Sequence, residues 1–191
     1  IMSVSILDHF VNFKQRFIFD NDIVLPDLCF VCDLHAYSIA KNDLKPFNKI
    51  YICENYYIKS IKSKIKANKE NNILYVLENL SEDWGEEKPW KISFDNFYLN
   101  FYKKSNKLGR IIVRPHPKDD PSIYEELKSY KEVVFDNHIS IQESLNSASI
   151  IVGAESYILY IGSEIGYDVY TSIPSFIRKP RLPDCSYKFI V

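Results

Sequence analysis

The chain has 191 residues, of which 46% are hydrophobic and 26% charged, and its formal net charge is −1 at pH 7. These values are ordinary for a globular protein, and the lack of a basic excess argues against a nucleic-acid partner. No apolar run approaches the roughly 20 residues that a helix needs to cross a bilayer. The length is enough for one good hydrophobic core or two small ones.

The first part of the chain alternates between strand-like and helix-like segments. Residues 1–7 are typical of a strand, and residues 8–17 are compatible with a helix. No secretory signal is present, so we expect a cytoplasmic protein, and because the chain opens directly on a strand we expect that upstream sequence has been trimmed. Further strands are expected at residues 27–32, 49–53 and 73–77, and helices at residues 36–41 and 58–69.

Four cysteines are present, and the pair Cys29 and Cys32 has the spacing of many metal and redox motifs. Here the pair falls inside a predicted strand, where residues three apart point to opposite faces. We therefore expect no shared metal or disulfide, and interpret the cysteines as buried thiols of a reducing compartment.

The second part repeats the alternation. Residues 80–90 are expected to form a polar loop, and residues 94–104 carry the apolar stripe of an amphipathic helix. Further strands are expected at residues 111–113, 132–135, 150–153 and 168–173, and helices at residues 121–130, 141–147 and 156–166. This order predicts an α/β fold with a parallel, doubly wound, Rossmann-like sheet. A polar run at residues 68–72 suggests a boundary between two lobes, with a ligand cleft between them.

A basic corner follows the predicted strand 111–113. Arg114, His116 and Lys118 stand at every second position, and Pro115 and Pro117 fix the backbone between them. Ligands of open α/β sheets bind at the carboxyl ends of the strands. The corner therefore predicts a seat for a phosphate or carboxylate, while ordinary solvated loop charges remain the alternative.

A second anion seat is predicted after the strand 150–153, where Ser156 opens a helix. Free amides and the positive end of the helix dipole favour a phosphate there. The alternative is that Ser156 only caps the helix. Two such seats at the carboxyl ends of strands of one sheet favour the ligand-binding interpretation.

The motifs His116-Pro117 and Ser156 resemble those in the donor-binding half of bacterial GT-B glycosyltransferases, particularly sialyltransferases and capsule or lipooligosaccharide transferases. The resemblance covers residues 73–174. It implies a GT-B-like, nucleotide-sugar-binding lobe in residues 71–191, preceded by a partial acceptor-side lobe in residues 1–70. It further implies transfer of a sugar, of the sialic-acid type, from a nucleotide sugar to a surface-polysaccharide acceptor.

The resemblance also implies partners and roles. The partners would be a nucleotide sugar and a glycan acceptor, with no metal or other cofactor, in the cytoplasm and in peripheral contact with the inner face of the membrane. His116 would lie beside the donor phosphate and could give it a proton, and Glu164 is a candidate ribose contact. The expected nucleotide- and phosphate-binding residues are Arg114, His116, Pro117, Lys118, Glu155, Ser156 and Glu164.

One departure concerns the general base. The sialyltransferase pattern places an acidic tripeptide in the N-terminal domain, and none stands before Ile73. Residues 81–85 are close in composition but follow the wrong strand. Either the base lies upstream, or Asp8 at the end of the first strand takes its place, or catalysis is absent.

Because the acidic tripeptide is missing, a second function remains possible. The chain could be a non-catalytic domain that binds a nucleotide or sugar phosphate in a polysaccharide-synthesis system. A third interpretation is a sugar-nucleotide epimerase, which shares the architecture.

Overall fold

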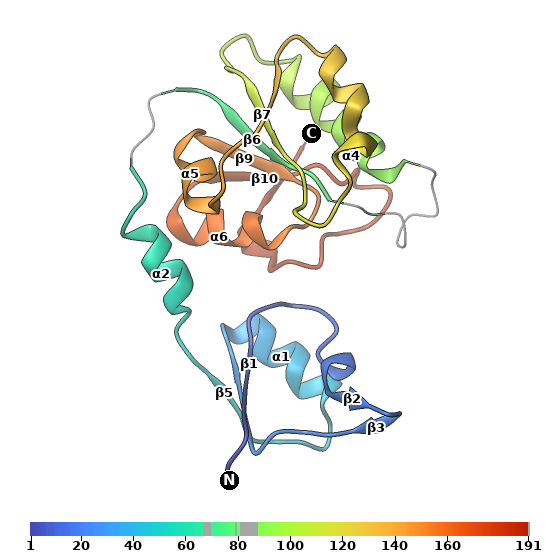
Figure 1. Ribbon diagram of the computed structural model, residues 1–191, viewed down its shortest axis with the longest axis vertical. Helices are drawn as coiled ribbons and strands as arrows, with labels where there is room; N and C mark the ends of the chain where they lie inside the picture. The colour runs from blue at the N-terminus through green and yellow to red at the C-terminus, as the bar shows by residue number, and fades with distance from the viewer. Residues whose placement is uncertain (67–69, 79, 81–87, 191) are drawn as a thin grey trace. The chain divides into compact units, whose positions relative to one another are not determined.

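The protein is described by a computed structural model that covers residues 1–66, 70–78, 80 and 88–190 (Figure 1). The chain divides into two compact units, Ile1–Lys59 and Ser60–Val191. The assignment of residues 1–70 and 71–191 to two functional lobes stays a prediction, and the polar run that suggested it lies partly outside the described residues.

The first unit is built on a parallel three-stranded sheet in the order β1 (Val4–Leu7), β4 (Leu28–Val31) and β5 (Ile50–Ile52). Helix α1 (Leu34–Asp43) begins after Asp33, whose side chain accepts a hydrogen bond from the Ala36 amide at 2.7 Å. This arrangement satisfies one of the unpaired amides of the first turn. Helix α2 (Tyr56–Lys62) follows β5, and the boundary between the two units falls within this helix, after Lys59.

The helix expected at residues 8–17 is wrong. Asn12 has a φ of 60°, a left-handed conformation that interrupts a right-handed helix, and only a short 3-10 turn, η1 (Lys14–Phe17), forms. A hairpin of β2 (Ile18–Phe19) and β3 (Asp22–Ile23) follows. Its two turn residues, Asp20 and Asn21, both have positive φ, as a tight type I′ hairpin turn requires.

The second unit contains a six-stranded sheet in which every pairing is parallel. Its strands are β6 (Ile73–Val76), β7 (Ile111–Arg114), β8 (Val133–Phe135), β9 (Ile150–Gly153), β10 (Asp168–Thr171) and β11 (Lys188–Phe189). The spatial order is β11-β10-β9-β6-β7-β8. Counted within the unit, this is the doubly wound Rossmann order. The predicted fold class is therefore confirmed, although the sequence did not predict β11.

Helices cover both faces of this sheet, with α4 on one side and α5 and α6 on the other (Figure 1). Helix α4 (Pro89–Phe97) continues into a π-helical turn, η2 (Tyr98–Tyr102). The segment η3 (Pro121–Ser129) is 3-10 rather than α-helical. The remaining elements are α5 (Ile141–Asn146), α6 (Tyr157–Ile165) and the 3-10 turn η4 (Asp184–Ser186).

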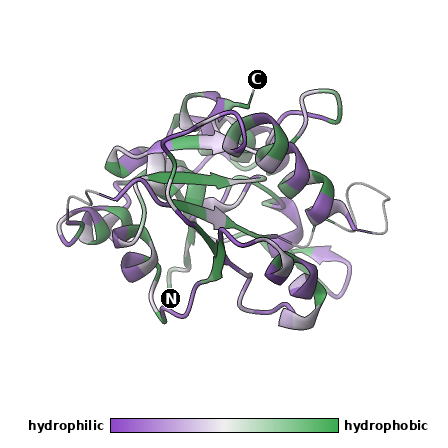
Figure 2. Ribbon diagram, turned by 90° about the horizontal axis from the view of Figure 1, so that it is seen from above, coloured by the Kyte–Doolittle hydropathy of each residue, from purple (hydrophilic) through white to green (hydrophobic). Residues whose placement is uncertain are grey.

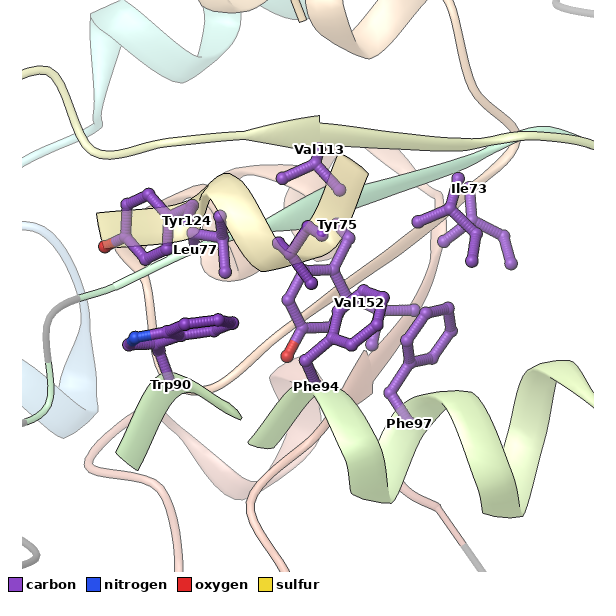
Figure 3. Packing of buried hydrophobic residues seen from close by; sticks show 11 residues of the cluster. Ile73, Tyr75, Leu77, Trp90, Phe94, Phe97, Val113, Tyr124 and Val152 are labelled. Carbon is purple, nitrogen blue, oxygen red and sulfur yellow. The ribbon is translucent and has the colours of Figure 1, made fainter. Parts of the chain in front are cut away.

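The main hydrophobic cluster lies between the sheet and α4 (Figure 3). Tyr75 of β6 is fully buried, and its ring lies 5.1 Å from that of Phe94 and 5.0 Å from that of Phe97. Figure 3 shows both phenylalanines pointing from α4 toward Tyr75. The colouring of Figure 2 shows hydrophobic residues concentrated on the central strands. The apolar stripe predicted for residues 94–104 is confirmed, because Phe94 and Phe97 of α4 are buried in this cluster.

Helix α6 lies close against the sheet on the opposite side. A Cβ atom at Gly162 would come within 2.3 Å of the Ile151 side chain, so the absence of a side chain permits this approach. The helix ends at Gly166, whose φ of 100° suits the left-handed C-cap conformation. These two glycines help to fix the helix whose N-terminus faces the carboxyl edge of the sheet.

Among the described residues, no helix combines the length and the apolar character needed to span a membrane.

Candidate site at the carboxyl edge of the sheet

The strand order reverses between β6 and β9, which makes this the topological switch point of the sheet. In open α/β folds, ligands bind outside the carboxyl ends of the strands at such a point. In the strand register, Val76 pairs with Arg114 on one side and Gly153 on the other, so those two backbones are about 10 Å apart. The segments after β6 and β9 therefore form the candidate site.

Ser156 is the N-cap of α6, and its hydroxyl accepts a hydrogen bond from the Ile158 amide at 3.3 Å. The capping role considered for Ser156 is thus observed. The neighbouring amides also face an acceptor, because the Glu155 N–H donates to Glu78 Oε2 at 2.8 Å and the Ser156 amide lies near enough to the same carboxylate to lower its pKa. A carboxylate of the chain itself occupies the seat that the sequence assigns to a phosphate.

Glu78 follows the end of β6 by two residues, and its carboxyl group has an unusual pKa of about 7. Burial is the main cause, since it disfavours the charged form, and the negative charge of Glu155 adds to the effect. The amides of Glu155 and Ser156 and the charge of Arg181 act in the opposite direction and lower the pKa. Glu78 therefore changes its charge near neutral pH, as functional carboxyl groups often do.

Glu155 lies at the predicted edge, but its side chain is clamped by two arginines. Arg178 donates to its two carboxylate oxygens at 2.7 and 2.6 Å, and Arg181 donates from its backbone and its side chain. Burial would raise the pKa of Glu155, but these hydrogen bonds outweigh it and hold the pKa below its ordinary value. Glu155 is thus an ionised carboxylate with only 6% of its side chain exposed.

Arg114 is the predicted site residue whose surroundings differ most from the expectation. Its guanidinium donates to Asp136 Oδ2 at 2.8 Å, to Ser144 Oγ at 2.7 Å and to the His138 carbonyl at 3.1 Å. The Asp136 side chain is fully buried. Burial would raise the pKa of Asp136, but hydrogen bonds from Ser144, His138 and Arg114 lower it. These three hydrogen bonds all come from Nη1, so Arg114 supports a buried carboxylate of the chain itself, a role that the sequence did not predict.

His116 lies in a tight turn, with 49% of its side chain exposed. Its Nδ1 accepts a hydrogen bond from the Lys118 amide at 3.3 Å and lies 3.9 Å from Asp119 Oδ1. The Asp119 amide in turn donates to the His116 carbonyl at 3.0 Å. Pro117 and Lys118 are exposed beside it. The corner thus presents the imidazole to solvent on a backbone held by its own hydrogen bonds.

Glu164 is not brought to this edge. It lies in the last turn of α6, about 12 Å along the helix axis from Ser156, and is exposed. Its backbone carbonyl accepts a hydrogen bond from Lys62 at 3.2 Å. The predicted ribose contact by Glu164 therefore has no support from its position.

Asp8 lies in the first unit, where it lines a cavity of about 500 Å³ at the carboxyl ends of β1, β4 and β5. Its carboxylate is 59% exposed and lies 3.4 Å from His9 Nε2. Aromatic and polar side chains complete the lining: Phe30, Cys32, Cys53, Glu54, Asn55, Tyr56 and Tyr57, with Ile6 and Leu7. Aromatic faces beside carboxylates can bind a hydroxyl-rich ligand such as a sugar ring.

All four cysteines are thiols, but they are not uniformly buried as the sequence suggested, since Cys185 is exposed and Cys32 and Cys53 are partly exposed. Val31 and Ile52 are the last registered pair of β4 and β5, so Cys32 and Cys53 are the next neighbours across the strands. Their Cα atoms should be about 5 Å apart, within the range that a disulfide spans.

We predict that the oxidant diamide links Cys32 to Cys53, because they are adjacent on one face of the sheet. Peptide mapping by mass spectrometry of the oxidised protein should detect the linked pair, and the Cys32→Ser variant should lose it. Cys29 is fully buried and should remain a thiol. Preferential linkage of Cys29 or Cys185 would contradict the parallel register of this unit.

Within the described ranges, no group of three or more His, Cys, Asp or Glu side chains is arranged to hold a metal ion. The expectation that no metal is needed stays a prediction. A second hollow, of about 1010 Å³, runs along β7 and β8 and includes Asp136 and His138. It contains none of the residues of the switch point.

Sequence reasoning missed Glu78, Arg178 and Arg181. Glu78 carried a usable signal, because it directly follows a strongly apolar strand, as Arg114 does. The arginines lie in a basic segment after β10, more than 20 residues from Glu155. Their contacts with Glu155 depend on the path of the chain after β10, which brings both arginines back to the carboxyl edge of the sheet.

No protein-family model matches the sequence, and no curated protein matches it. Among solved structures, a protein assigned as a UDP-N-acetylglucosamine 2-epimerase from Listeria monocytogenes aligns with 76% of this chain, at 11% identity and a TM-score of 0.50. The likeness shows the fold alone. A UDP-GlcNAc 2-epimerase from Methanocaldococcus jannaschii aligns with 75% at 14% identity and a TM-score of 0.46. The chain spans less than half the length of either protein, with 42% and 45% covered.

The GT-B-like α/β fold predicted from the sequence is therefore a fold shared with a protein named for its action on a nucleotide sugar. The narrower resemblance to sialyltransferases finds no support in these comparisons.

Proposed function

We propose that the chain binds a nucleotide sugar at the carboxyl edge of the six-stranded sheet and serves in a glycosyltransferase. The observation that carries this proposal is the switch point between β6 and β9, where the N-terminus of α6 lies beside Arg178 and Arg181. Helix amides and guanidinium groups are the donors that most often bind phosphate in proteins.

In the proposed reaction, the leaving nucleotide phosphate is stabilised at this edge, and His116 gives it a proton. The acceptor is a surface-polysaccharide glycan, whose hydroxyl would lose its proton to Asp8, and the transferred sugar is of the sialic-acid type. The scheme uses no metal. It places the protein in the cytoplasm, at the inner face of the membrane that carries the acceptor.

A second candidate function is epimerisation of a sugar nucleotide, which the structural likeness to the Listeria protein favours. Incubation with UDP-GlcNAc and, in parallel, with a nucleotide-activated sialic acid separates the possibilities. An epimerase forms the 2-epimer without an acceptor, whereas a transferase releases nucleotide only when an acceptor glycan is present. Binding without either product would indicate the non-catalytic domain.

The proposed phosphate contact predicts that His116→Ala weakens nucleotide binding about ten- to a hundredfold, because a charge-assisted hydrogen bond is lost. Stability should change by no more than about 0.5 kcal/mol, since the side chain is exposed. Calorimetric titration with CDP and UDP, together with melting curves, measures both quantities. His35→Ala, an exposed histidine outside both candidate sites, is the control. Unchanged affinity in the His116 variant would refute this contact.

A further inference from the structure

The carboxylate of Glu78 lies where the proposed site at the N-terminus of α6 would bind a phosphate. It accepts a hydrogen bond from the Glu155 amide at 2.8 Å and lies near the Ser156 amide, directly before a nine-residue helix whose dipole favours an anion there. An external phosphate that used these amides would need the same N–H groups. The two acceptors therefore compete for one seat.

The charges around Glu78 make joint occupancy unfavourable. Glu155 lies beside it, and both guanidinium groups close to this pair, those of Arg178 and Arg181, already donate to Glu155. The negative charge of Glu78 also raises the pKa of the phenols of Tyr75 and Tyr124. Among the described residues, the charges of these two carboxylates and two guanidinium groups are balanced, so an added phosphate would leave an excess of negative charge.

We propose that Glu78 is an internal plug of the phosphate seat, and that a nucleotide binds when this carboxyl group takes up a proton and releases the amides. The inference rests on the proposed function, because it concerns the same seat. Its ionised form closes the seat, and its protonated form, which no longer repels a phosphate, leaves it open. The pKa of about 7 places the change between the two forms near neutral pH.

The proposal predicts how strongly the dissociation constant of a nucleotide depends on pH. If binding requires one proton on a group that titrates near pH 7, the dissociation constant should rise about tenfold per pH unit above that point. Between pH 6 and pH 8.5 the rise should be about thirtyfold. At the upper end of this range, about one proton should be taken up for each nucleotide bound.

The test is calorimetric titration with CDP and with UDP between pH 6 and pH 8.5, in two buffers of different ionisation enthalpy. Wild type should show the thirtyfold weakening and the proton uptake. Glu78→Gln keeps an oxygen acceptor without the charge, so it should bind tightly at pH 8.5 and take up almost no proton. Both proteins share the ionisation of the ligand, so their difference isolates Glu78.

Glu125→Gln, at an exposed glutamate of η3, is the matched control and should behave as wild type. Equal pH dependence in wild type and Glu78→Gln would overturn the plug while leaving the proposed function intact. No binding of either nucleotide at pH 6 by any variant would overturn the proposed function, and the plug with it. Glu78→Ala makes the same test if the glutamine variant folds poorly.

Discussion

Replacing Arg114 with alanine is expected to lower the free energy of unfolding by about 3–5 kcal/mol, because the fully buried carboxylate of Asp136 would lose its cationic partner. Asp136 would keep its contacts with the Ser144 hydroxyl and with the backbone and ring of His138, but it would lose the guanidinium that neutralises it. Denaturant titration followed by tryptophan fluorescence measures the change, since both tryptophans belong to the second unit.

Arg110→Ala is the matched control, because Arg110 is exposed at the other end of the same strand and should change stability by less than about 0.5 kcal/mol. Adding Asp136→Ala to Arg114→Ala should recover part of the loss, since it removes the stranded charge. If Arg114→Ala instead melts like wild type and only nucleotide affinity falls, the ion pair is dispensable and Arg114 acts on the ligand, as the sequence predicted.

The ion pair also has a pH signature. The pKa of Asp136 is lowered in the folded state, so its contribution to stability is present above the unfolded pKa, near 4, and is lost as the pH falls through the folded value. That acid-side loss should be absent from the double variant.

The strands and helices of the second unit could be predicted because their patterns are local. Apolar runs such as Ile73–Val76 predict buried parallel strands wherever they stand in the chain. The segment after β1 could not be predicted in this way, because the left-handed backbone of Asn12 decides its path. Neither Asp20-Asn21 nor the two-residue strand β11 carries a strong pattern, so the hairpin and the sheet edge were missed.

The candidate site was only partly predictable, because its pairings follow the order of strands in space. The alternation of Arg114 and His116 suggested a shared face, but the strand ends at Arg114 and the two side chains have different surroundings. The strand β6 lies between β7 and β9, and this central position is what brings Glu78 to the amides of α6. No local sequence window contains that information.

Phe94→Ala is expected to lower the free energy of unfolding by about 3–5 kcal/mol, the usual cost of removing a fully buried phenylalanine. The ring contacts four other aromatic rings, those of Tyr75, Phe97, Tyr98 and Tyr130, with centroids 5.1 to 5.9 Å away. Phe94→Leu should lose less, because leucine refills most of the volume. Denaturant titration followed by tryptophan fluorescence again measures the free energy of unfolding of the second unit.

Leu99→Ala provides the comparison in the same helical segment, because Leu99 is 61% exposed and should change stability by no more than about 0.5 kcal/mol. A loss below 1 kcal/mol for Phe94→Ala would show that the aromatic cluster is not closely packed. Phe94 lies on the face of the sheet opposite to α6. The folded variant should therefore keep wild-type affinity for nucleotides, so that a core defect and a site defect remain distinguishable.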